Sequence, residues 1–164
     1  MKIKIILFIN VLTIPVTVNY VKAQNASLNG NWNFKDQQSI SGNIYENGSP
    51  KKAAITQNGD RLKLTTTIST GDLDSTFTEA LSIMPFETIT GRSHKKKVSV
   101  ISWLPDHSGF TEISTIYSKD DSSKADYRNT DKWTLQHGQL TLDRKSENFI
   151  NGETWESTAT YTKR

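Results

Sequence analysis

The stretch KWTLQHGQLTLDR, Lys132–Arg144, decides the fold class because it predicts a β-hairpin in a definite register. If His137 and Gly138 form a two-residue loop, apolar side chains face apolar side chains across the two strands. The facing pairs are Leu135 with Leu140 and Trp133 with Leu142. Gly138 tolerates a positive φ and His137 is forced into one, which indicates that His137 is a turn residue and not a ligand.

The segments on either side of this stretch also predict hairpins, by the same criterion of facing side chains. AAITQNGDRLKLTTTI, Ala53–Ile68, predicts a hairpin that turns at Asn58-Gly59. Its facing pairs are Ile55 with Leu62 and Ala53 with Leu64. A further hairpin is predicted to close at Asn151-Gly152 and to return through ETWESTATYTKR, Glu153–Arg164. Successive hairpins of this kind form a meander.

The whole pattern is one of strands and turns, and it predicts roughly eight to ten strands in an all-β domain. Such a chain forms either a closed antiparallel up-and-down barrel or a two-sheet sandwich. The chain has no cysteine, and closure into a barrel suits it because closure removes exposed edges without disulfides. The polar segment Ser118–Asp131, SKDDSSKADYRNTD, is expected to be a mobile loop over one end.

The first 23 residues predict a secretory signal peptide, so the protein is expected to be secreted or periplasmic. Lys2 and Lys4 precede an apolar run that is too short and too interrupted to span a bilayer, and Val21-Lys22-Ala23 has the small residues of a cleavage site. Cleavage after Ala23 leaves a single domain over residues 24–164.

Cleavage also changes the meaning of the net charge. The leader holds Lys2, Lys4 and Lys22 and no acid, so its removal lowers the 20 basic residues by three and balances the 17 acidic ones. The formal charge of +3 therefore gives no support to a nucleic-acid partner. The cluster HKKK, His94–Lys97, leads into a strand and is expected to solvate a turn or protect a sheet edge.

The stretch SLNGNW, Ser27–Trp32, places a Gly-x-Trp motif at the start of the first expected strand. This motif resembles the first motif of lipocalins and related up-and-down barrels, and the chain looks like a secreted bacterial lipocalin-like domain. Avidin-like barrels share the feature and are the weaker relative. The lipocalin resemblance implies that Trp32 plugs one end of the barrel, that Gly30 lets the chain turn in under it, and that an arginine stacks over the ring. Arg164 is the first candidate for that arginine and Arg144 the second.

Strand parity places a set of side chains on one face of the C-terminal hairpin. With the turn at Asn151-Gly152, the facing pairs are Trp155 with Asn148, Ser157 with Ser146, Ala159 with Arg144, and Tyr161 with Leu142. If this face points inward, it lines a pocket that has apolar walls and a few polar groups. The predicted ligand-binding residues are Arg144, Ser146, Asn148, Trp155 and Tyr161. An inward Arg144 is able to hold a ligand carboxylate with two hydrogen bonds, whereas a bulge near Asp143 turns it outward.

No catalytic constellation is predicted. His94, His107 and His137 are scattered over turns without the spacing of metal ligands, and neither a phosphate-binding loop nor a nucleophile elbow occurs. We therefore expect no enzyme activity, no cofactor and no metal. Two functions remain open: a binding protein that holds a small apolar or amphipathic ligand, and an interaction protein with a packed barrel whose loops contact a protein or a glycan.

Overall fold

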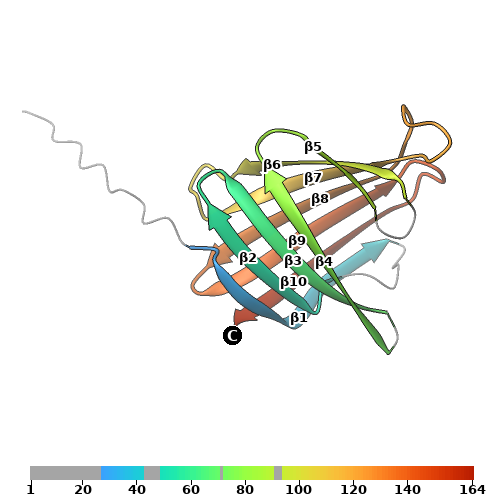
Figure 1. Ribbon diagram of the computed structural model, residues 1–164. Helices are drawn as coiled ribbons and strands as arrows, with labels where there is room; N and C mark the ends of the chain where they lie inside the picture. Colours follow the sequence, from blue (N-terminus) through green and yellow to red (C-terminus); the bar gives the residue numbers. More distant parts are fainter. Residues whose placement is uncertain (1–26, 43–48, 71, 91–93) are drawn as a thin grey trace, which may run out of the picture.

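The computed structural model describes residues 27–42, 49–70, 72–90 and 94–164, and the predicted signal peptide lies outside them. The described part of the chain contains ten β-strands (Figure 1). They are β1 (Gly30–Gly42), β2 (Lys52–Asn58), β3 (Arg61–Thr70), β4 (Leu73–Ser82), β5 (Phe86–Ile89), β6 (Lys96–Trp103), β7 (Gly109–Tyr117), β8 (Ala125–Gln136), β9 (Gln139–Asn148) and β10 (Thr154–Lys163).

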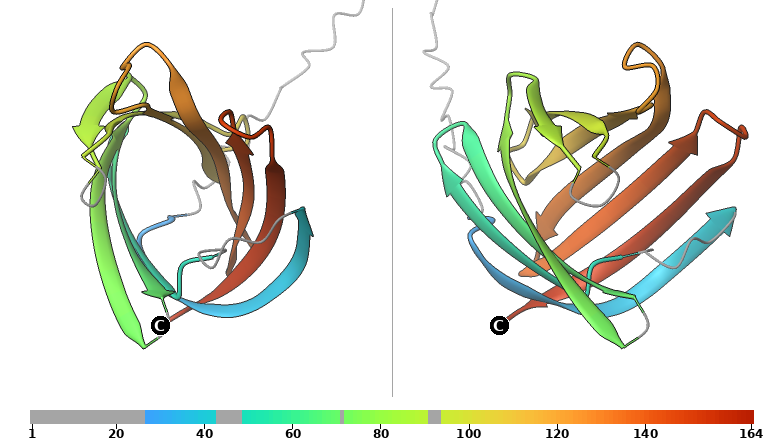
Figure 2. Two further views of the ribbon diagram at one scale, coloured as in Figure 1. Left: turned by 90° about the vertical axis from the view of Figure 1, so that its right-hand side faces the viewer. Right: turned by 45° about the vertical axis from the view of Figure 1, so that its right-hand side comes forward.

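The strands form one antiparallel sheet in the order β4-β3-β2-β1-β10-β9-β8-β7-β6-β5. Strands that follow one another along the chain are neighbours, and the pairing of β1 with β10 joins the first strand to the last. The sheet curls until β4 approaches β6 across an unpaired seam (Figure 2). The protein is therefore an all-β, up-and-down meander barrel that is nearly closed, and the two-sheet sandwich is excluded.

The hairpin that decided the fold class has the predicted register. Leu135 lies opposite Leu140, and Trp133 lies opposite Leu142. His137 and Gly138 form the turn with φ values of 51° and 78°. Positive φ at both central residues is the geometry whose twist matches that of the flanking strands, so the turn interpretation of His137 is confirmed.

The registers predicted for the other two hairpins are wrong by two residues. Ile55 lies opposite Leu64 and not Leu62, because the turn is formed by Gly59 and Asp60, and of these two only Gly59 has a positive φ. In the C-terminal hairpin Trp155 lies opposite Ser146 and not Asn148, because the connection runs over residues 149–153. A slip of two residues leaves every side chain on the same face, so the predicted faces are retained.

The expected loop Ser118–Asp131 is wrong in its second half, because β8 already begins at Ala125. From there the chain pairs with β7 on one side and β9 on the other. The strand is polar because its inward-facing residues line a polar part of the barrel, so its sequence lacks the apolar alternation by which strands are normally recognised. Only residues 118–124 form the connection.

Apolar side chains fill the end of the barrel that holds the β2–β3, β6–β7 and β8–β9 turns. The buried cluster consists of Leu28, Trp32, Ala53, Ile55, Leu62, Leu64, Leu81, Ile101, Phe110, Trp133, Leu140, Leu142, Ala159 and Tyr161. Aromatic rings form its centre, where Trp133 lies 5.6 Å from Tyr161 and 6.5 Å from Phe110 between ring centroids. This core stabilises a chain that has no disulfide.

Trp32 belongs to this core, with 1% of its surface exposed, and its Nε1 donates a hydrogen bond to the Leu28 carbonyl at 3.1 Å. The cation over the ring is Lys163, whose Nζ lies 5.5 Å from the ring centroid. The expectation that Arg164 or Arg144 stacks over the Trp32 ring is therefore wrong, because Lys163 is the residue directly opposite Trp32 in the β1–β10 pair. Gly30 makes room for it, since a Cβ at Gly30 would lie 2.7 Å from the Lys163 Cε.

Candidate functional site

The half of the barrel above the apolar core contains a cavity of about 450 Å³. Leu64 and Trp133 belong both to the core and to the cavity lining, so the core forms the floor. The walls combine apolar side chains with charged ones. The apolar group includes Ile68, Phe77, Ile116, Tyr127 and Trp155, and the charged group consists of Glu79, Lys97, Glu112, Asp131 and Arg144.

Four of the five predicted site residues line this cavity. They are Arg144, Ser146, Asn148 and Trp155. Tyr161 shares their inward face but lies deeper, with none of its surface exposed, in the core beneath the cavity. Burial raises the pKa of its phenol above the ordinary value. Tyr161 therefore supports the floor of the cavity from below.

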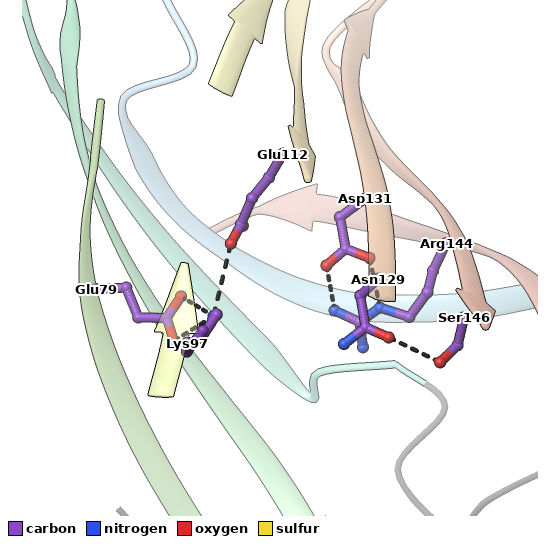
Figure 3. Close-up of polar contacts among 7 residues, drawn as sticks. All are labelled: Glu79, Lys97, Glu112, Asn129, Asp131, Arg144 and Ser146. Carbon is purple, nitrogen blue, oxygen red and sulfur yellow. Dashed lines mark hydrogen bonds and ion pairs between the residues drawn. The ribbon is translucent and has the colours of Figure 1, made fainter. Parts of the chain in front are cut away.

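Arg144 points inward and is paired with Asp131, which lies directly opposite it across the β8–β9 pair (Figure 3). Arg144 Nε donates to Asp131 Oδ1 at 2.7 Å, and its Nη2 donates to Asp131 Oδ2. Burial alone would lower the pKa of Arg144, but the charge and hydrogen bonds of Asp131 outweigh burial and hold that pKa above its usual range. No register shift occurs in β9, so the alternative of a bulge that turns Arg144 outward is excluded.

A second ion pair crosses the seam of the barrel. Lys97 Nζ, from β6, lies 2.7 Å from both carboxylate oxygens of Glu79 in β4. Glu112, from β7, lies on the other side of Lys97 at 3.6 Å between Nζ and Oε1 (Figure 3). The side chain of Lys97 is only 15% exposed. Our expectation that the HKKK cluster solvates a turn or an edge is wrong for Lys97, because β6 begins at Lys96 and the strand alternation turns the next side chain inward.

Glu112 is the most deeply buried of these carboxylates, with 4% of the residue exposed. Burial raises the pKa of Glu112 from its ordinary 4.5 to about 7, and Lys97 opposes the shift without cancelling it. Burial therefore makes Glu112 easier to protonate near neutral pH than a solvated glutamate.

Neutral polar groups complete the wall beside the Arg144–Asp131 pair. Ser146 Oγ donates to Asn129 Oδ1 at 2.7 Å, again between residues directly opposite each other in β8 and β9. The sequence interpretation missed Asn129, Asp131 and Glu112. A usable signal was present for Asp131: the register predicted for the β8–β9 hairpin, continued past Trp133, places Asp131 opposite Arg144.

The three histidines are exposed and have positive φ values of 51° to 55°, so they lie at turns away from the cavity. Among the described residues no group of three or more His, Cys, Asp or Glu side chains is arranged to hold a metal ion. No helix in the described ranges is long and apolar enough to cross a membrane.

Fold and site together define a class: a nearly closed, up-and-down β-barrel with a solid apolar end and a charged internal cavity. Comparison with models of known protein families found no match, and comparison with curated proteins found no relative either.

Proposed function

We propose that this protein is a secreted, lipocalin-like binding protein that holds a small amphipathic ligand in its barrel and has no enzymatic role. The observation that carries the proposal is the cavity of about 450 Å³. Ligand pockets typically have volumes of about 300–1,000 Å³ and combine apolar walls with a few placed polar groups. The cavity has both features.

The lining favours an amphipathic ligand over a purely apolar one. Phe77, Ile116 and Trp155 offer an apolar surface, while Glu112 and Asn129 add hydrogen-bonding groups. A purely apolar molecule would cover these polar groups without replacing the water that solvates them, at a cost in free energy. A ligand with one polar end avoids that cost.

Two features support the lipocalin-like part of the proposal. The barrel is an antiparallel meander, and the Gly-x-Trp motif lies at its filled end with a cation, Lys163, over the ring of Trp32. Secretion rests on the leader sequence alone, and N-terminal sequencing of the exported protein tests it. The expected first residue is Gln24, and a retained Met1 would contradict the assignment.

The binding function is tested by filling the cavity. Ser114 lines the cavity and is 5% exposed, so Ser114→Phe places a ring in the ligand space. Thr115→Phe is the matched control, because the next residue of the same strand points to the opposite face. Native mass spectrometry of the protein from its own host is expected to show a bound small molecule for wild type and Thr115→Phe and none for Ser114→Phe. Equal occupancy of all three would refute a ligand in this cavity.

The alternative, an interaction protein, is favoured by one observation at the mouth of the barrel. Phe149 and Ile150, in the β9–β10 connection, are 47% and 66% exposed. Exposed apolar side chains on a loop are a common feature of protein contacts. In that case Phe149→Ser with Ile150→Ser would abolish capture of a partner protein and leave small-molecule binding unchanged.

A further inference from the structure

The charged groups of the cavity are unequal in number. Of the described residues that line it, three are acidic and two are basic: Glu79, Glu112 and Asp131 against Lys97 and Arg144. With all five ionised the cavity has one uncompensated negative charge. A low-dielectric wall strengthens the effect of such a charge on anything that enters.

Both basic groups are already engaged by carboxylates. Arg144 makes two contacts to Asp131, and Lys97 makes two to Glu79. An anionic ligand would have to displace one of these carboxylates and leave it unpaired, which is costly in a buried site. The structure therefore offers no ready place for the ligand carboxylate that the sequence suggested for Arg144.

Glu112 is the acid with the weakest compensation. Its contact with Lys97, at 3.6 Å, is longer than a hydrogen bond, and Lys97 lies closer to Glu79. Glu112 also lies beside Asp131, which is its direct neighbour across the β7–β8 pair, one step along the inward face from the core pair Phe110 and Trp133. Figure 3 shows the Glu112 carboxylate extended toward the cavity-facing Lys97.

We propose that the ligand carries a cationic group, of the kind found in a primary amine, which binds against the Glu112 carboxylate while its apolar part lies along Phe77 and Ile116. This inference rests on the proposed ligand-binding function. A bound ammonium brings the charge of the cavity to zero without breaking either ion pair. Its N–H groups also supply Glu112 with charge-assisted hydrogen bonds.

Binding of a cation at Glu112 is expected to depend on pH in a definite direction. The charged groups that face Glu112 are Lys97 on β6, Glu79 on β4, Asp131 on β8 and Arg144 on β9. Burial raises the pKa of Glu112 to about 7, so a cation binds mainly to the ionised form, whose fraction grows as pH rises. An alkylamine stays protonated below about pH 9. Its affinity should therefore increase about 30-fold from about pH 5.5 to about pH 8.

The test uses three probes with the same eight-carbon chain: octylamine, octan-1-ol and octanoate. Binding is followed by calorimetry on wild type, Glu112→Gln and Glu112→Asp, with Glu87→Gln as the matched control because Glu87 is exposed on β5. Wild type and Glu87→Gln should bind octylamine at least about tenfold more tightly than either other probe. Glu112→Gln should lose this preference and its pH dependence, and Glu112→Asp, which keeps the carboxylate, should retain the preference.

The outcomes separate the inference from the function on which it rests. If octan-1-ol or octanoate binds wild type as tightly as octylamine does, the cationic ligand is refuted while the binding function stands. An unchanged amine preference in Glu112→Gln would refute the role of Glu112. If none of the three probes binds, the proposed function fails together with the inference.

Discussion

The ion pair between Arg144 and Asp131 provides the sharpest test of the barrel interior. The two side chains are 16% and 10% exposed, and they face each other across directly paired strands. Removing one partner of a buried ion pair costs about 3–5 kcal/mol, because the remaining charge is left without compensation. Contact with the cavity leaves each group partly solvated, so we expect Arg144→Met and Asp131→Asn each to lose about 3 kcal/mol of unfolding free energy, at the low end of that range.

This value is the reverse of what an unpaired Arg144 would give. With Arg144 alone on an apolar face, Arg144→Met would leave stability equal or higher. With Asp131 opposite Arg144, the same substitution leaves the buried Asp131 carboxylate without its ion-pair partner. The double variant removes both charges, and replacement of a whole buried pair is often close to neutral.

Urea unfolding of the wild type, the two single variants and the double variant, followed by tryptophan fluorescence, measures the coupling directly. We expect the double variant to lose at least about 2 kcal/mol less than the two single losses taken together. Additive losses would show that the two side chains do not interact, and the geometry of the cavity wall would then be wrong.

Three further outcomes are expected. Glu112→Gln should change how the unfolding free energy depends on pH. Burial raises the pKa of Glu112 from 4.5 to about 7, so the contribution of Glu112 to the unfolding free energy is fully present below about pH 4.5. About 3 kcal/mol of that contribution is lost as pH rises through about 7. Unfolding free energies at several pH values should show this loss in wild type and not in Glu112→Gln. Trp32→Ala should cost about 3–5 kcal/mol, the usual range for emptying an aromatic core site, and wild-type stability in that variant would contradict the buried position of the ring. Gly138→Ala should cost about 1–2 kcal/mol in the same assay because φ at this turn is 78°, and a neutral result would show that the turn has another conformation.

The fold was largely predictable because the barrel is built from local hairpins. Apolar pairing across His137-Gly138 determined one register correctly, and the predicted faces survived slips of two residues in the other hairpins. The slips arose at the turns. Gly59 takes the first turn position, so the loop lies one residue later than an Asn-Gly turn. Sequence patterns on strands report the face of a residue more reliably than its partner, because the side-chain period is two.

The cavity was predictable only in part. Arg144, Ser146, Asn148 and Trp155 were found because they follow a hairpin with recognisable apolar residues. The first half of β8, which pairs with β9, was missed because its cavity-lining residues are polar. A polar strand looks like a loop when polarity alone is considered. Glu112 and Lys97 were missed for other reasons: Glu112 lies opposite Asp131, in the part of β8 that was taken for a loop, and Lys97 has its carboxylate partner Glu79 on β4, across the seam of the barrel.

The division of the barrel into two unlike halves bears directly on function. The apolar end, centred on Trp133 and Tyr161, is filled in the way that stabilises a small domain without disulfides. The charged end adds little to stability, because apolar side chains of similar volume often replace buried ion pairs without loss. A chain whose only requirement was a stable fold could have filled this end with apolar side chains as well. The buried carboxylate of Glu112 departs furthest from that requirement, since burial disfavours its charged form. Folding removes water from the Glu112 carboxylate at a cost in free energy. A ligand that binds to this carboxylate would replace the lost solvation and so explain why the chain keeps a buried acid here.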